Sequence, residues 1–361
     1  MLLLQNFWES YSHRPKKHIY KETFMKPERN NSLDRLKALS IIFVLIWHLQ
    51  PIKFIIDSNS HTLLVVIARI FLDLQLQLCL IAVPLFYIIS LYLFFQKPEL
   101  QSLKKRLIRL IKIYLVWSIF QNIFYMIISQ ELPTWSWDII TGIQPSLPLV
   151  GDSVFYFLFN LIILLIFAFL YQIQSKKLKL IVSLTLVGFS LFYFEALYFF
   201  NSNLPYHWLL NFLIYIPIAF YLVNHPEKIL KFKGCYLIAY VLFSLHDIYL
   251  RIYNQIPSIY GRVSIVCGAL SIFCYIYSPQ NNQKNLLVEK IAKYSLGLFA
   301  LHKYWQYLFV LLLQKYKIAM MIGIFGIPLN IIFLVESIFV IFFTTLSIYL
   351  LKSTPFKQLV T

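Results

Sequence analysis

Residues 153–173 read SVFYFLFNLIILLIFAFLYQI, a run of 21 positions without a charged side chain. An α-helix rises about 1.5 Å per residue, so a helix of this length matches the hydrocarbon thickness of a bilayer. Runs of similar length and apolarity recur along the whole chain. They lie at residues 38–55, 76–96, 107–129, 153–173, 178–199, 206–224, 234–253, 262–278, 292–313 and 328–351. The sequence therefore predicts an all-α, polytopic transmembrane helix bundle of about ten spans.

The composition excludes an ordinary soluble fold. Hydrophobic residues make up 60% of the 361 positions, charged residues only 13%, and the mean hydropathy is +0.70. A soluble domain of this size could not hide so much apolar surface, so lipid must be the solvent for most of it. The chain has 9 Gly but 33 Phe and 25 Tyr. We therefore expect the helices to pack through aromatic bulk rather than through glycine contacts.

The distribution of charge predicts the topology. With a cytoplasmic N-terminus, 25 of the 32 Lys and Arg residues fall in cytoplasmic segments, which fits ten spans with both termini inside. The net charge of +17 is then explained by loops that face anionic lipid, and no nucleic-acid-binding motif accompanies it. We expect a basic cytoplasmic tail at 1–36, a membrane domain at 37–352 and a cytoplasmic tail at 353–361, in the cell (plasma or inner) membrane.

Two pairs of opposite charges interrupt the apolar runs. Arg69 and Asp73 are four residues apart in 62–74, a segment that we expect to lie at the membrane interface as a lead-in to the second span. Asp247 and Arg251 have the same spacing, which favours an ion pair within one helix. The four cysteines lie in or beside apolar runs without metal-ligand spacing, so no metal site is expected.

Residues 33–48, LDRLKALSIIFVLIWH, place two ionisable groups on one helix face. Lys37 and His48 are eleven residues apart, close to three full turns, so their side chains point the same way about 16 Å apart. We expect Lys37 at the cytoplasmic mouth and His48 near the middle of the span. An imidazole at that depth avoids lipid and faces a bundle interior or a polar cavity. A functional role and a structural hydrogen bond to a neighbouring helix both fit this spacing.

Further ionisable groups follow at three other places in the chain. Arg106 and Arg109, with Lys105 beside them, lie at the cytoplasmic entrance of the third span, where they could clamp phosphates or anchor the helix to lipid. His302 lies about ten residues into the ninth span, at the predicted level of His48. Glu336 lies in the middle of the tenth span, where a carboxylate is costly unless it is paired or protonated.

Four motifs together resemble the membrane-bound acyltransferase-3 family. The spacing of Lys37 and His48 matches the Arg/Lys, ten residues, then His of the family's first span. VPLFYIISLYLF (83–94) resembles its second span, with Phe86 and Ser90 in register. The sequence from Arg106 to Arg109 matches its RxxR motif, and KYSLGLFALH (293–302) resembles a late element that ends in His. The chain departs from the family where Ser90 is followed by Leu91 instead of glycine.

The resemblance implies an O-acyltransferase that moves an acyl group, commonly acetyl, from cytoplasmic acetyl-CoA (or another acyl-CoA) to a hydroxyl of a surface carbohydrate or lipid-linked glycan. It implies catalytic roles for His48, His302 and Lys37. Glu336 is a further catalytic candidate from its place in the middle of the tenth span, where it could orient a catalytic histidine or pair with a cation. Arg106, Arg109, Lys105 and Ser90 would bind the donor, which is a substrate and not a permanently bound cofactor. His48 would act as general base or accept the acyl group transiently, while His302 would orient His48 or stabilise charge on the thioester oxygen.

The same family resemblance leaves a second function open, because members of the family have also been proposed to export glycans. A polysaccharide or glycolipid transporter would need neither a base within the membrane nor a phosphate clamp at its inner mouth. The motifs therefore favour the enzyme. In either case we expect membrane lipids and a carbohydrate as partners, and no nucleic acid.

Overall fold

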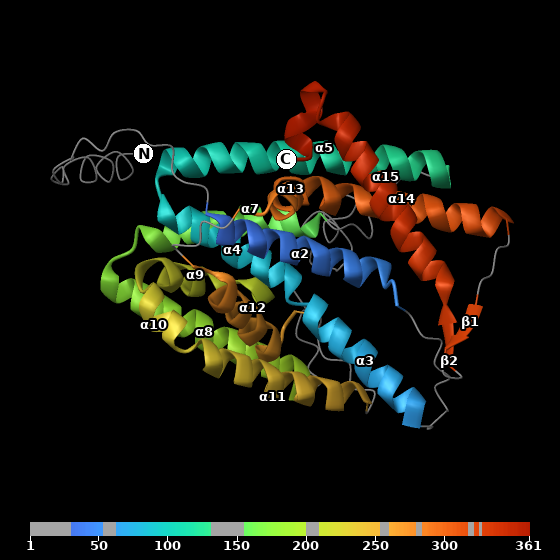
Figure 1. Cartoon of the computed structure of the whole chain (residues 1–361). Coiled ribbons are helices and arrows are strands. Elements are labelled where there is room, and N and C mark those ends of the chain that lie inside the picture. The colour runs from blue at the N-terminus through green and yellow to red at the C-terminus, as the bar shows by residue number, and fades with distance from the viewer. Residues whose placement is uncertain are drawn as a thin grey trace. The chain divides into compact units, whose positions relative to one another are not determined.

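The computed structural model describes residues 30–52, 63–130, 155–199, 209–252, 260–278, 284–316, 321–324 and 327–361 (Figure 1). The chain divides into two units, residues 1–30 and 31–361, and every element below belongs to the second. Most of the predicted basic tail lies outside the described residues, as do residues 131–154 between the third and fourth predicted spans.

Helices account for nearly all of the described chain (Figure 1). The longer ones are α2 (Asn31–Leu49), α3 (Leu63–Cys79), α4 (Ala82–Gln96), α5 (Leu100–Ser129), α7 (Tyr156–Gln172), α8 (Lys176–Phe199), α9 (Tyr215–Asn224), α11 (Lys233–Ile252), α12 (Val263–Ile276), α14 (Ser295–Tyr316) and α15 (Ile331–Leu351). Short helices are α10 (Pro226–Lys231), α13 (Leu286–Lys293), and the 3₁₀ turns η1 (Leu210–Phe212) and η2 (Pro355–Leu359). Strands β1 (Met321–Ile324) and β2 (Ile327–Asn330) pair antiparallel, with Ile322 opposite Leu329.

The helices have the length and apolarity that a membrane requires. Within the described residues, five helical segments are long and apolar enough to cross a bilayer, and three shorter apolar helices accompany them. The five are Val65–Gln96, Leu100–Ile128, Lys176–Phe194, Ser295–Gln314 and Ile331–Leu351. Large apolar side chains stay exposed on these helices, such as Phe192 and Ile338, which suits a surface solvated by lipid. The all-helical membrane fold is thereby confirmed, and each of the ten predicted runs overlaps a helical segment, while the span count and the orientation of the termini stay predictions.

Helix α3 continues into α4 through a short break. The amides of Leu80 and Ile81 bond the carbonyls of Leu76 and Leu78, so the second of these bonds is one residue tighter than in an α-helix. Pro84 follows in the first turn of α4, a place where its missing N–H costs no helical hydrogen bond. The predicted interfacial lead-in at 62–74 is therefore part of a continuous apolar segment with the second span.

The first helix begins earlier than the sequence predicts, at Asn31 rather than near residue 38. Its polar first turn is buried because the protein supplies partners for it. The Ser32 hydroxyl donates to the carbonyl of Ser278 (2.9 Å) and accepts from the amide of the same residue (3.1 Å). Ser278, just after α12, thus fixes the first turn of α2 through these two hydrogen bonds.

Helix α4 lies at the centre of the packing, against α2, α7, α9 and α12. Its Tyr87 is completely buried, and its ring contacts Phe157 of α7 and Phe212 of η1 with centroids 4.9 and 4.4 Å apart. Between helices in lipid the hydrophobic effect contributes little, so such close contacts are a main source of cohesion. The expected aromatic packing is present in this core.

The last residues of the chain also pack against the helices. The Trp117 indole donates to the carbonyl of Leu359 (3.2 Å), and Val360 is completely buried. At Gly297 of α14, an added Cβ would lie 2.9 Å from Val360 Cβ and 2.9 Å from Ile348 Cγ1. The predicted C-terminal tail is therefore seated between α5, α14 and α15.

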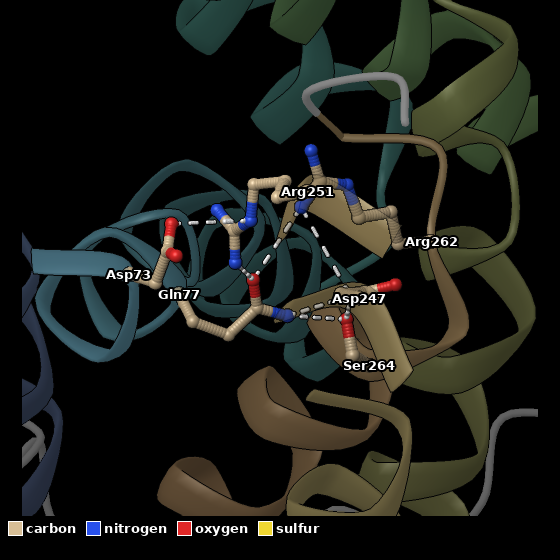
Figure 2. A network of polar contacts seen from close by, with 6 residues as sticks. All are labelled: Asp73, Gln77, Asp247, Arg251, Arg262 and Ser264. Atoms are coloured by element: carbon tan, nitrogen blue, oxygen red, sulfur yellow. Dashed lines mark hydrogen bonds and ion pairs between the residues drawn. The ribbon is translucent and has the colours of Figure 1, made fainter. Parts of the chain in front are cut away.

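A network of charged and polar side chains joins α3 to α11 and to residues at the start of α12 (Figure 2). Its members are Asp73, Gln77, Asp247, Arg251, Arg262 and Ser264. The Gln77 side chain lies at its centre and is 1% exposed. Its amide nitrogen donates to Asp247 Oδ2 and Ser264 Oγ, both at 2.7 Å. Its carbonyl oxygen accepts from Arg251 (3.0 Å) and Arg262 (3.4 Å), so this one amide meets four partners.

The ion pairs in this network differ from the predicted one. Arg251 pairs with Asp73 of α3 (3.4 Å), while Asp247 pairs with Arg262 (4.0 Å). The prediction of an Asp247–Arg251 pair within α11 was wrong. Each of the two residues instead meets an opposite charge beyond α11, because charges buried in a membrane bundle are held where partners converge.

Candidate functional site

His48 and His302 lie side by side although 254 positions separate them in the sequence. Their ring centroids are 5.1 Å apart and the ring planes are tilted by 41°. His48 comes from the last turn of α2 and His302 from the second turn of α14, two helices that pack together. His302 is completely buried and His48 is half-buried. The structure therefore brings together the two histidines that the sequence singled out.

The position of His48 along its helix differs from the prediction. Because α2 runs from Asn31 to Leu49, His48 lies in its final turn, whereas the sequence predicted an apolar run that continues to residue 55. Gln50 then takes a left-handed φ of 43°, and Pro51 follows. A left-handed residue other than glycine is strained by about 1–2 kcal/mol, so neighbouring structure must hold this helix end in place.

The hydrogen bond of His302 fixes which of its nitrogens carries the proton. Nδ1 lies 3.0 Å from the carbonyl oxygen of Leu298. A carbonyl can only accept, so Nδ1 donates and Nε2 keeps its lone pair. Nε2 is buried and has no hydrogen-bond partner among the described residues. A buried acceptor of this kind can receive a hydrogen bond or a proton from a group beside it.

Two aromatic residues next to His302 fix the rotation of α14. Tyr304 contacts three rings of α5, with centroids 6.2 Å from Trp117, 5.0 Å from Phe120 and 5.0 Å from Phe124. Trp305 faces α15, where its indole donates to Ser347 Oγ (3.0 Å). With these two faces occupied, the turns that carry His302 and Gln306 are directed at α2.

Glu336 joins this site through Gln306. The Gln306 amide nitrogen donates to Glu336 Oε1 (2.7 Å) and to the main-chain carbonyl of His48 (2.9 Å). Its amide oxygen accepts from Lys303 Nζ (3.0 Å). Glu336 is 4% exposed, so its carboxylate is held inside the protein by polar partners, as a charge at this depth requires.

Gln306 and Lys303 were missed by the analysis of the sequence. Neither belongs to a recognisable motif, and an uncharged amide in an apolar run gives no strong signal. One clue was available, since Gln306 follows His302 by four residues and so shares its helix face.

The other predicted site residues are spread along α2, α4 and α5. Lys37 is half-buried and, from its place on α2, about 16 Å along the helix from His48. Ser90 is half-buried on α4, which packs against α2. The predicted roles of Lys37 and Ser90 stay predictions.

The predicted phosphate clamp lies on the first turns of α5. The Arg106 guanidinium donates to the carbonyl of Leu93 (2.9 Å) and so caps the C-terminal end of α4. Arg109 is exposed and donates to the main-chain oxygen of Thr361, and Lys105 is exposed. Both arginines thus meet carbonyl oxygens at the end of a helix or of the C-terminal segment. The exposed parts of this basic turn could still meet a soluble anion.

No group of three or more His, Cys, Asp or Glu side chains in the described ranges is arranged to hold a metal ion. The polar side chains that the structure brings together at the site are the two imidazoles and the group of Gln306, Glu336 and Lys303.

Comparison with protein-family models identifies the family of this chain. A family model described as an acyltransferase domain, the acyltransferase-3 model, matches residues 30–352. No curated protein and no solved structure matches the chain significantly. The matched range contains all of the predicted site residues and both residues that the sequence analysis missed.

Proposed function

Because this chain belongs to the acyltransferase-3 family and is a membrane acyltransferase, we propose that it moves an acetyl group from cytoplasmic acetyl-CoA to a carbohydrate hydroxyl. The acceptor is a cell-surface or exported glycan, or its lipid-linked precursor. The chain would reside in the plasma (inner) membrane as ten spans with both termini in the cytoplasm. The distribution of Lys and Arg supports this orientation.

One observation carries the proposal: two imidazoles meet inside an apolar helix bundle, and one of them has a buried, unpartnered nitrogen. A histidine pair that only held helices together would be expected to use its polar atoms on neighbouring helices. Here His302 bonds a carbonyl of its own helix and keeps Nε2 directed into the protein. This arrangement supports a role of the histidine pair in the reaction rather than a purely structural contact.

The reaction needs a base, because a sugar hydroxyl is a weak nucleophile at neutral pH. His48 takes the hydroxyl proton as the oxygen attacks the carbonyl carbon of the thioester. The C–S bond then breaks, and the CoA sulfur receives that proton from the imidazolium. The products are the O-acetyl ester and free CoA thiol. A positioned base of this kind contributes typically about 10²–10⁴-fold to the rate.

His302 supports this step by orienting His48. With its proton on Nδ1, the neutral ring has a lone pair at Nε2, which would accept a hydrogen bond from an N–H of His48 when the two rings turn toward each other during the reaction. This tautomer has no N–H left to donate to the thioester oxygen. Of the two roles predicted for His302, orientation of His48 is therefore the one that its hydrogen bond supports.

The basic first turns of α5 would hold the donor. CoA carries phosphates that cannot enter hydrocarbon, so they remain at the membrane surface while the thin pantetheine arm reaches inward. Arg109 and Lys105 are exposed there, and Arg106 lies beside them at the end of α4. Forked guanidinium groups suit phosphate oxygens. Lys37 and Ser90 would line the route toward His48.

The test is substitution of the base in purified protein. We expect His48→Ala to abolish transfer of labelled acetyl from acetyl-CoA to glycan acceptors, followed by thiol release and by mass spectrometry of the acceptor. His225→Ala is the matched control, because His225 is exposed at the end of α9 and its ring stacks on Tyr221 of the same helix. It should retain activity within about twofold. Acetylation that survives in a folded His48→Ala protein would refute the proposal, and glycan movement without acetylation would favour the exporter.

A further inference from the structure

The Gln306 side chain uses both amide hydrogens and its amide oxygen at the candidate site. Its two amide hydrogens meet the His48 carbonyl and Glu336, and its oxygen meets the Lys303 ammonium. Turning the amide over would place its oxygen against two acceptors and its NH₂ group against a cation. The observed orientation is therefore the one that its partners enforce.

The contact to His48 compensates for the end of a helix. The last carbonyls of an α-helix have no amide donor four residues further on. Helix α2 ends at Leu49, and the left-handed Gln50 and the following Pro51 prevent its continuation. The carbonyl of His48 is one of these terminal acceptors, and the donor it receives comes from α14. Without that donor, the turn that carries the imidazole would be held less firmly.

Two successive turns of α14 hold the same residue. His302 lies against the ring of His48, and Gln306, four residues later on the same face, binds its main chain. Gln306 also ties this contact to α15 through Glu336. The backbone and the ring of His48 are thus located by one rigid helix.

We propose that Gln306 is a positioning residue, which holds the last turn of α2 so that the His48 imidazole keeps its place against His302 and the reacting hydroxyl. The inference rests on the proposed function, since it assigns Gln306 a role in the step that His48 performs. Misplacing a reacting group by about 1 Å can cost roughly 10²-fold in rate. Loss of the Gln306 amide should therefore lower kcat by about 10- to 100-fold. KM for acetyl-CoA should change by less than about threefold, because the donor phosphates bind elsewhere.

The experiment compares three variants of the full chain in detergent or nanodiscs. Gln306→Leu keeps most of the volume and removes all three polar contacts. Gln306→Glu keeps an acceptor for Lys303 but loses both donors. Gln306→Lys keeps a donor for His48 and Glu336 but loses the acceptor. We expect the order of kcat to be wild type, then Gln306→Lys, then the other two together.

Two controls separate the possible failures. Gln314→Leu changes an exposed glutamine two turns later on the same helix and should leave kcat within about twofold. His48→Ala reports on the proposed function itself. If His48→Ala is inactive but folded Gln306→Leu keeps wild-type kcat, the positioning role is wrong and the proposed function stands. If Gln306→Lys is as slow as Gln306→Leu at equal thermal stability, the donor to His48 is not what matters and the inference fails. If His48→Ala stays active, both are overturned.

Discussion

Replacing Gln77 by leucine should destabilise the protein by about 2–4 kcal/mol. The substitution removes the amide at the centre of the network between α3, α11 and Arg262 and leaves its volume largely filled. Hydrogen bonds between membrane helices average about 0.6 kcal/mol each, so four of them contribute roughly 2 kcal/mol. Two guanidinium groups also lose one acceptor each while they keep their ion pairs with Asp73 and Asp247, so this loss adds no more than about 1–3 kcal/mol, the cost of a buried group left without a partner.

The assay is the free energy of unfolding in mixed micelles, measured by titration with a denaturing detergent. Gln174→Leu is the matched control, because Gln174 is half-buried and its amide makes one solvent-exposed hydrogen bond, to the carbonyl of Leu170 in the preceding turn. It should change the free energy by less than about 0.5 kcal/mol. Gln77→Glu should be at least as harmful as Gln77→Leu, because it places a carboxylate against Asp247. A free energy within 0.5 kcal/mol of wild type for Gln77→Leu would refute the reasoning.

Two further predictions concern the C-terminal segment and the donor site. Gly297→Ala should destabilise the protein by about 1–3 kcal/mol, because the new methyl group meets Val360, and trypsin should then cut the C-terminal segment faster. Gly234→Ala, in α11 with nothing within 4 Å of the added Cβ, should be neutral or stabilising. Replacing Arg106 and Arg109 together by alanine should raise KM for acetyl-CoA at least tenfold, measured by initial rates. An unchanged KM would mean that the two arginines have structural roles and do not bind the donor.

The helices were largely predictable, because a run of about 20 apolar residues determines where the chain can cross lipid. The start of α2 was not, since the burial of Asn31 and Ser32 depends on Ser278, a partner 246 residues away from Ser32. The position of the break between α3 and α4 could not be predicted either, because Pro84 lies in the first turn of α4, where a helix tolerates proline. Length and apolarity thus predict the existence of helices better than their ends.

The candidate site was predictable where helical periodicity applies. Counting residues placed His48 and His302 at one level, and the structure brings their rings together even though His48 lies at the end of its helix. The hydrogen-bond partners of the ionisable groups could not be predicted by counting residues along a helix. Gln306 and the Leu93 carbonyl that binds Arg106 become neighbours only when helices pack, and spacing within one helix carries no information on that packing.

The network around Gln77 has a consequence for biosynthesis. Gln77 and Asp247 are 170 residues apart, so at about 5–20 residues per second the ribosome needs roughly 10–30 s to supply the second after the first. During that interval α3 carries Asp73 and Gln77 without the residues that satisfy them in the folded protein. The network can therefore form only after α11 and the residues that begin α12 have been made, and α3 should gain its full stability at that late point of synthesis.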